Sequence, residues 1–326
     1  MEQFVKPIVG ISKCLEFDNC RYNGAVVKNH LIRTLKNHVE FLPVCPEVGI
    51  GLGTPRDTIR LVKIDGKKNL YQNSNQRNLT ELMNEYSDKF LEKISSIDGF
   101  ILKNGSPTCG VENTRYYHKI GKEVGYDMST GIFTDSIIKK FPNLILEDES
   151  RLRNSILRDS FLTRLFSMAH LRHSLISKSK SSIDDFFLKN KMLFMCYSPL
   201  ETKNLRYLIS NRENFEKKEF NAMLKLSVFN ILNRIPESES LENTFMYIFN
   251  LIKEQLQSSE INYYHALVDD YRNGFATHSQ ISTLLYSWAL RFNLDDLKFQ
   301  SIFNPYPKQL ISNVVGKNRN HSLLKI

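Results

Sequence analysis

The sequence predicts an α/β protein, in which an N-terminal α/β domain with a mostly parallel sheet is followed by an all-α C-terminal domain. Short apolar runs alternate with helical patterns through the first half of the chain. From about residue 150, amphipathic stretches at helical spacing follow one another without a convincing strand. The length of 326 residues suits two domains better than one. We therefore expect an α/β domain over 1–149, an all-α domain over 150–312 and a loose tail over 313–326.

The first half is expected to alternate strands with helices. Short apolar runs predict strands over 7–12, 40–44, 59–64, 99–102 and 144–146. Apolar residues at three- and four-residue spacing predict helices over 28–38, 78–97 and 131–141, and we expect a further helix over 112–123. In parallel sheets ligand sites gather beyond the carboxyl ends of strands, so the loops after these strands are the first place to look for a site.

The second half is expected to consist of helices joined by short loops. Their expected ranges are 149–176, 182–196, 199–210, 216–233, 240–257, 260–273, 278–292 and 295–303. This half is also the basic one: residues 151–326 have a net charge of +8, whereas residues 1–150 have a net charge of +1. Such an uneven charge favours contact of the second half with a polyanion, and a solvated helical surface rich in lysine is the alternative.

Bulk properties exclude some classes of protein. No apolar run reaches the roughly 18 residues that a membrane span needs. The first residues lack the apolar core of a signal peptide. We therefore expect a cytoplasmic protein with no membrane partner, in which the five cysteines are not a disulfide framework.

Three cysteines are the main candidates for chemistry. Cys14, Cys45 and Cys109 each follow an apolar run that reads as a strand, and Cys109 also precedes the expected helix over 112–123. Three thiolates that meet near the ends of neighbouring strands would make a metal or cluster site with one open position. Their spacing matches no common zinc finger, so scattered structural thiols are the alternative.

Four other side chains in the same loops are candidates for contacts to a base or a phosphate. They are Arg21, Tyr22, Arg56 and Lys103. Each could instead brace its loop.

The motifs around these cysteines resemble those of a known family. They are Ser-x-Cys-Leu…Cys-Arg-Tyr-Asn-Gly from Ser12, Cys-Pro-Glu-Val-x-Ile-Gly-Leu-Gly-x-Pro-Arg from Cys45, and Leu-Lys-x-x-Ser-Pro-Thr-Cys-Gly up to Gly110. A closing segment follows, with Gly131-Ile-Phe and Phe141-Pro…Glu147-Asp-Glu…Arg151-Leu. In this order, over about residues 5–150, the four motifs resemble the thiouracil desulfidase family. The second half has the segments Arg151-Leu-Arg, Lys191-Met-Leu, Ser198-Pro199, Asp270-Tyr-Arg-x-Gly274 and Pro305-Tyr-Pro307. In these it is similar to the YbgA-type domain that is fused behind the first in bacterial tRNA 4-thiouridine desulfidases.

This resemblance implies a cofactor and a division of roles. It implies a [4Fe–4S] cluster held by Cys14, Cys45 and Cys109, with one open iron that takes the sulfur of a thiolated uracil. It marks Glu47 and Ser106 as catalytic and leaves Cys20 as a neighbour of the site that is not a ligand. No electron transfer is required, so no redox partner is expected.

The expected function is therefore removal of sulfur from thiouridine in tRNA, with 4-thiouridine as the first choice of base. One alternative keeps the chemistry but acts on free thiouracil or a thionucleoside. The other is a nucleic-acid-binding protein in which the cysteines hold a structural zinc or a sensor cluster. Candidates for RNA phosphate contacts in the helical half are Arg164, Arg172, Lys178 and Lys180.

Overall fold

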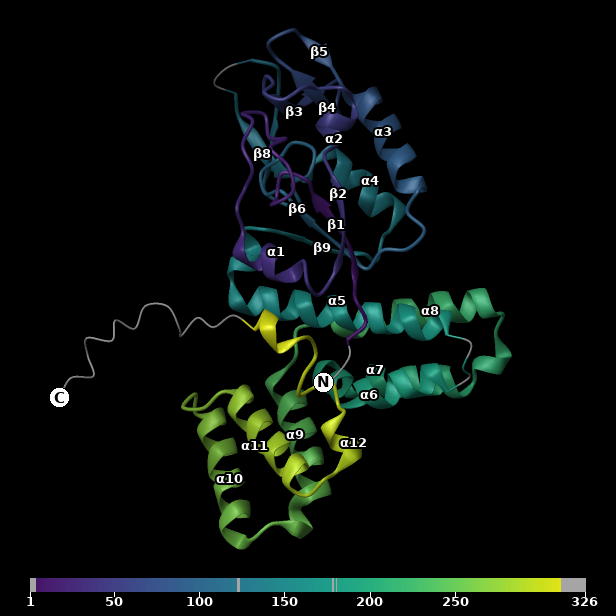
Figure 1. Ribbon diagram of the computed structural model, residues 1–326, viewed down its shortest axis with the longest axis vertical. Coiled ribbons are helices and arrows are strands. Elements are labelled where there is room, and N and C mark those ends of the chain that lie inside the picture. The colour runs from purple at the N-terminus through teal and green to yellow at the C-terminus, as the bar shows by residue number, and fades with distance from the viewer. Residues whose placement is uncertain (1–3, 122–123, 178, 180, 312–326) are drawn as a thin grey trace, which may run out of the picture. The chain divides into compact units, whose positions relative to one another are not determined.

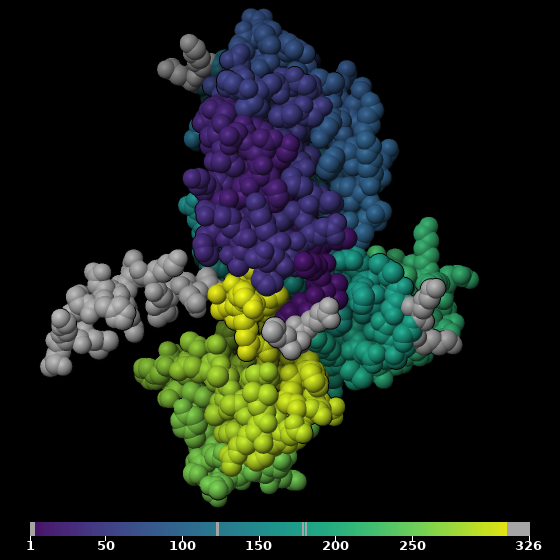
Figure 2. Space-filling view, in the orientation of Figure 1, coloured from purple at the N-terminus to yellow at the C-terminus, as the bar shows by residue number. Residues whose placement is uncertain are grey.

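The computed structural model describes residues 4–121, 124–177, 179 and 181–311. These residues form two compact units (Figure 1). One comprises Lys6–Leu165 with the described part of Pro307–Ile326, and the other comprises Phe166–Tyr306 with the described part of Met1–Val5. Figure 2 shows the same chain as a surface, with the first unit mainly in purple to blue and the second mainly in teal to yellow. Lys178, Lys180 and the expected tail over 313–326 lie outside the described residues.

The first unit is built on a parallel sheet. Its strands follow the order β2 (Glu40–Val44), β1 (Ile8–Ser12), β6 (Gly99–Leu102) and β9 (Ile145–Asp148), and every neighbouring pair is parallel. All four residues of β6 are buried, as a strand covered on both faces of a parallel sheet must be. The α/β fold expected from the sequence is confirmed.

Helices α1 (His30–Leu35), α3 (Thr80–Glu92) and α4 (Ile132–Lys140) belong to this unit, and α3 and α4 lie side by side (Figure 1). The ring of Phe133 on α4 meets Phe100 of β6 edge to face, with centroids 6.4 Å apart. Phe100 in turn packs so closely on β1 that a Cβ added at Gly10 would lie 2.0 Å from its ring. The sheet and α4 are thus held together by close aromatic packing.

A second sheet departs from the expectation. Its order is β5 (Arg77–Asn78), β4 (Lys67–Gln72), β3 (Ile59–Ile64), β7 (Thr114–Tyr117) and β8 (Tyr126–Ser129), and only the β3–β7 pair is parallel. The helix expected over 112–123 is therefore wrong, because that segment contains β7. The run Thr-Arg-Tyr-Tyr has the β-branched and aromatic residues that strands favour, and its partner β3 lies some fifty residues earlier in the chain.

The second unit is helical. Its helices are α5 (Ser155–Ile176), which the division between the units crosses, α6 (Ser182–Tyr197), α7 (Pro199–Ser210), α8 (Lys217–Leu232), α9 (Ser238–Ile252), α10 (Ser258–Arg272), α11 (His278–Arg291) and α12 (Asp295–Lys298). Among the described residues, no helix has the length and apolar character needed to cross a bilayer.

Aromatic packing marks the core of the helical unit. Phe249 and Tyr264 stack with centroids 4.0 Å apart, and both contact Trp288. The Cys196 thiol is buried on α6, where loss of solvation raises its pKa to about 12. Cys196 is thus a packed core thiol, consistent with its place on an apolar helix stripe.

Candidate active site

Three loops meet at the carboxyl ends of three adjacent strands. Strand β1 lies between β2 and β6, and its last residue, Ser12, pairs with Val44, the last residue of β2. Cys45 follows β2 directly, Cys14 lies two residues after the end of β1, and the loop after β6 leads to Cys109. The register of the parallel sheet therefore brings three segments that are far apart in the sequence to one edge.

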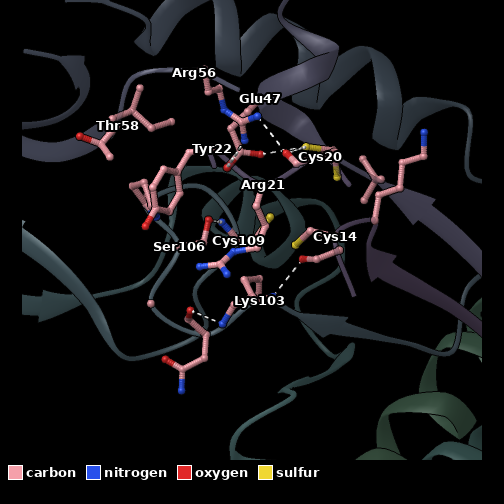
Figure 3. A pocket seen from close by; sticks show the side chains of 18 of the residues that line it. Cys14, Cys20, Arg21, Tyr22, Glu47, Arg56, Thr58, Lys103, Ser106 and Cys109 are labelled. Atoms are coloured by element: carbon pink, nitrogen blue, oxygen red, sulfur yellow. Dashed lines mark hydrogen bonds and ion pairs between the residues drawn. The ribbon is translucent and has the colours of Figure 1, made fainter. Parts of the chain in front are cut away.

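A cavity of about 220 Å³ lies at this edge (Figure 3). All the site residues expected from the sequence line it: Cys14, Arg21, Tyr22, Cys45, Glu47, Arg56, Lys103, Ser106 and Cys109. Figure 3 shows Cys14 and Cys20 on one side of the pocket, Tyr22 and Thr58 on the opposite side, and Glu47, Ser106 and Cys109 between them. The fold thus brings the cysteines and the two candidate catalytic residues together.

Four thiols surround part of this cavity. Cys20 and Cys109 are buried, and Cys14 and Cys45 are partly buried. The Cys20 thiol interacts with those of both Cys14 and Cys45. The contact with Cys14 and then burial raise the pKa of Cys20 to about 11, although the contact with Cys45 lowers it. Cys20 therefore lies beside these thiols and lines the cavity with them.

The anionic forms of two further thiols are disfavoured by their surroundings. The Cys20 thiol and then burial raise the pKa of Cys45, and burial followed by the Glu47 carboxylate raises the pKa of Cys109. A positively charged metal centre would reverse this preference.

Glu47 is buried on the short helix α2 (Pro46–Gly49), for which Cys45 is the N-cap residue. Its Oε1 accepts a hydrogen bond from the Thr108 hydroxyl at 2.6 Å, and its Oε2 accepts one from Cys45 Sγ at 3.4 Å. Arg56 Nη2 lies 3.9 Å from Oε1 and makes an ion pair with the carboxylate. The carboxylate is thus oriented from three sides while it faces the cavity.

Ser106 belongs to a tight loop between β6 and Cys109. Its Oγ accepts hydrogen bonds from the backbone N–H groups of Thr108 and Cys109, at 3.3 and 3.1 Å. It also lies 3.0 Å from Thr108 Oγ1. The hydroxyl is therefore fixed in position at the edge of the cavity.

The four candidate substrate-binding residues differ in the contacts that they already make within the protein. Arg56 donates to the carbonyl oxygens of Cys20 and Gly53, at 2.9 and 3.3 Å, and so braces two loops. Lys103 Nζ donates to Glu149 Oε1 at 2.5 Å and to the Asn104 carbonyl oxygen at 3.0 Å. These two cations line the cavity, but both already have partners in the protein.

Arg21 and Tyr22 lie on the loop between Cys20 and α1. The Arg21 guanidinium lies 5.5 Å from the centroid of the Tyr22 ring, and Tyr22 is 45 % exposed. This pair leaves an aromatic surface at the mouth of the cavity, which is a suitable place for a base or a sugar to rest.

Sequence reasoning missed three residues of the site. Thr108 is fully buried between Glu47 and Ser106. Ser12 Oγ accepts a hydrogen bond from the Lys103 backbone N–H at 2.9 Å. Glu149 Oε2 accepts one from the Asn104 backbone N–H at 2.8 Å. Thr108 and Ser12 lie within motifs already singled out, so their place beside the cysteines was a usable signal. Glu149 follows β9 in the run Glu147-Asp148-Glu149, in which all three residues are buried.

The donor set fits an iron–sulfur cluster better than one metal ion. Thiolates are the ligands of such clusters and can come from separate loops, each binding a different iron. A single tetrahedral zinc requires its sulfur ligands to lie about 3.8 Å apart, as its bond length of about 2.3 Å dictates. Within the described ranges, no group of three or more His, Cys, Asp or Glu side chains is arranged to hold one ion. A structural zinc therefore has no ready ligand set among them.

Comparisons with known proteins agree with this geometry. Residues 9–149 match the family model described as 2-thiouracil desulfurase, and residues 191–307 match the one described as a protein of unknown function, DUF1722. The uncharacterized protein YbbK of Bacillus subtilis (strain 168) is 32 % identical over 107 residues, which are 31 % of this chain and 71 % of that protein. The chain belongs to the 2-thiouracil desulfurase family, with a DUF1722 (YbgA-type) domain behind its N-terminal half.

One solved structure was also found, titled [4Fe-4S]-dependent thiouracil desulfidase TudS. It shares 24 % identity with this chain at a TM-score of 0.38, and the match covers 48 % of this chain and 99 % of that one. The family expected from the sequence motifs is confirmed by the family models.

Proposed function

We propose that this protein is an iron–sulfur-dependent desulfidase that converts a thiolated uracil to uracil and releases sulfide. The observation that carries this proposal is the meeting of Cys14, Cys45 and Cys109 with Glu47 and Ser106 in one cavity of a 2-thiouracil desulfurase domain. The reaction is a net hydrolysis, in which water replaces the thione sulfur and no electrons are gained or lost. Neither a reductant nor a redox partner is needed.

Cys14, Cys45 and Cys109 would hold a [4Fe–4S] cluster. When bound, such a cluster with one iron free of protein ligands supplies a Lewis acid for the sulfur of the base. Cys20 is proposed as a neighbour of that cluster, because its thiol touches two of the three ligands.

The protein side chains would handle the proton and orient the base. The carboxylate of Glu47 faces the cavity and is positioned to take a proton from the attacking water and return it to the departing sulfur. Ser106 is held at the cavity edge by two backbone N–H groups, so its oxygen stays in place when its hydroxyl donates a hydrogen bond to the base.

The volume of the cavity limits the size of the group that can enter it. Its volume of about 220 Å³ lies below the ~300–1,000 Å³ of sites for drug-sized ligands, so it suits a single base. A base in RNA would have to leave its stack to enter. We propose 4-thiouridine in tRNA as the substrate because the half of the chain behind the desulfidase domain has a net charge of +8. Free thiouracil is the second candidate, supported by the name of the family. The proposed location is the cytoplasm, where thiols stay reduced.

The test is anaerobic reconstitution with iron and sulfide, followed by addition of 4-thiouridine tRNA or free 2-thiouracil. We expect the thione absorbance to fall and sulfide to appear. Loaded protein that leaves the thione bands of both substrates intact would exclude a desulfidase.

The Glu47→Gln variant should keep its cluster and lose about 100- to 1,000-fold in kcat, because the carboxylate that accepts the proton is gone. Glu40→Gln is the matched control, because Glu40 is an exposed residue of β2 that does not line the cavity. It should keep both cluster and rate. A Glu47→Gln variant with wild-type kcat would remove Glu47 from the mechanism.

A further inference from the structure

Thr108 connects the two residues to which the proposed function assigns chemistry. Its side chain is fully buried, and its hydroxyl is hydrogen-bonded both to Glu47 and to Ser106. Glu47 lies 61 positions before it in the chain, on a different loop. Thr108 is thus the contact through which the Cys45 loop meets the Ser106 loop.

A threonine hydroxyl has a single proton, so the direction of its hydrogen bonds can be worked out. The distance of 2.6 Å to Glu47 Oε1 lies in the range of about 2.5–2.7 Å for O–H···O⁻ bonds, whereas the Cys109 sulfur is 3.6 Å away. The proton therefore points at Glu47. Toward Ser106, 3.0 Å away, Thr108 Oγ1 can then only accept.

This direction determines where the Ser106 proton lies. Ser106 Oγ already accepts from the N–H groups of Thr108 and Cys109, so its own proton is its remaining contribution. At rest that proton points at Thr108 Oγ1. When a substrate enters, the same proton can turn to the base while the oxygen stays in place.

The backbone of Thr108 is fixed from behind. Its carbonyl oxygen accepts the N–H groups of Phe133 and Thr134, at 3.0 and 3.2 Å, from the first turn of α4. Gly131 allows this approach, because a Cβ at that position would lie 2.3 Å from the same oxygen. A residue that the fold holds so firmly can orient others.

We propose that Thr108 is a positioning residue that holds the Glu47 carboxylate toward the attacking water and sets the donor direction of Ser106. The inference rests on the proposed function for its meaning in catalysis, but its geometry can be tested without it. A displacement of about 1 Å in a reacting group can cost about 100-fold in rate, so loss of this contact should be visible in kcat.

The experiment compares Thr108→Val, which keeps the shape and removes the hydroxyl, with Thr108→Ser, which keeps the hydroxyl. With the cluster loaded, we expect Thr108→Val to lose 10- to 100-fold in kcat, with KM within threefold and iron content unchanged. Thr108→Ser should recover to within threefold of wild type. A Thr108→Val variant with wild-type kcat would overturn the proposal, and so would one that folds but no longer takes up iron, since Thr108 would then serve the cluster.

Thr134→Val is the matched control. Thr134 is a fully buried threonine beside Thr108, and its hydroxyl has no hydrogen-bond partner among the residues that the structure describes. Its loss should leave kcat unchanged.

A second readout does not need activity. In a crystal structure of the cluster-free Thr108→Val variant, the Glu47 carboxylate should turn away and Ser106 should change its rotamer. Unchanged positions of both side chains would overturn the proposal. If wild-type protein proves inactive, the proposed function fails, while this structural comparison still decides whether Thr108 holds Glu47 and Ser106.

Discussion

At the scale of single residues, the cysteines differ in what surrounds them. Cys109 is buried between Glu47, Ser12 and Thr108, and burial followed by the Glu47 carboxylate raises the pKa of its thiol. Cys20 is buried too, but its main contacts are the thiols of Cys14 and Cys45. Cys109 thus lies among the groups to which the proposed function assigns chemistry, whereas Cys20 lies beside other thiols.

The first prediction separates these two cysteines. Cys109→Ser should lose the cluster, because an alcohol is a poor ligand for iron, whereas Cys20→Ser should keep it. Iron content and visible absorbance after anaerobic reconstitution measure the difference. Cys196→Ser is the control, since Cys196 is buried in the helical unit and should not matter. Loss of iron from Cys20→Ser but not from Cys109→Ser would show that the ligand set is wrong.

At the scale of elements, the site depends on a glycine, Gly131, at the point where the backbone before α4 comes close to the loop of Ser106 and Cys109. Gly131 precedes α4, and a Cβ there would lie 2.3 Å from the Thr108 carbonyl oxygen and 2.8 Å from the Cys109 backbone nitrogen. Both atoms belong to the loop that carries Ser106 and Cys109, so this loop has no room to yield without moving the site. The packing of α4 on the loop therefore connects the fold to the chemistry.

Gly131→Ala should accordingly lower the free energy of unfolding by about 1–3 kcal/mol, the usual cost of overpacking, and weaken iron uptake. Gly53→Ala is the matched control, since a Cβ at Gly53 would meet nothing within 4 Å. It should change the free energy of unfolding by no more than about 0.5 kcal/mol. Urea unfolding of the cluster-free proteins measures both, and equal stabilities would contradict the close approach.

In the helical unit, α5 and α6 meet through a neutral histidine. Asn190 Nδ2 donates to the Phe186 carbonyl oxygen at 2.8 Å and lies 3.3 Å from His170 Nδ1, while its Oδ1 accepts the Ser301 hydroxyl at 2.8 Å. The amide is thus oriented so that His170 Nδ1 must accept. Burial first, then the charges of Lys189 and His173, lower the pKa of His170 to about 4.

This lowered pKa predicts a pH dependence of stability. Between about pH 6.5 and 4 the unfolded chain binds a proton at His170 that the folded protein does not, so stability falls as pH falls through this window. The shift corresponds to about 3 kcal/mol. Urea unfolding from pH 7 to 4 should show a shallower loss in His170→Gln than in wild type. His30→Gln, which changes an exposed histidine, should keep the wild-type slope, and identical slopes in all three would refute the role of His170.

At the scale of the whole molecule, the two halves of the chain differ in charge. The desulfidase half is nearly neutral, and the half that includes the DUF1722 match has a net charge of +8. A small base has no phosphates with which such a surface could interact, whereas RNA has one per nucleotide. The charge difference therefore bears on which substrate reaches the cavity.

The corresponding prediction concerns salt. With 4-thiouridine tRNA, kcat/KM should fall steeply between 50 and 200 mM salt, because binding releases counterions in proportion to the phosphates contacted. With free 2-thiouracil, the same change in salt should have little effect. The free base is the internal control, because it shares the chemistry but has no phosphate. A flat salt response with tRNA would favour the free base as the substrate.

Much of the fold and site was determined by the sequence itself. The strands over 40–44, 59–64 and 99–102 and the helix over 199–210 coincide with the observed elements, because apolar periodicity is a local property. The meeting of the three cysteine loops was also within reach, since strand-end loops with cysteines predict a shared edge. Glu47 and Ser106 were singled out only by the family resemblance.

Only the tertiary structure decided the rest. Strand β7 forms where a helix was expected, because its partner β3 lies far away in the chain. Thr108 contacts Glu47 across 61 positions, and Glu149 holds Asn104 across 45, so no local pattern could reveal either contact. Hydrogen bonds between distant segments depend on how the sheet aligns its strand ends, and that alignment exists only in the folded chain.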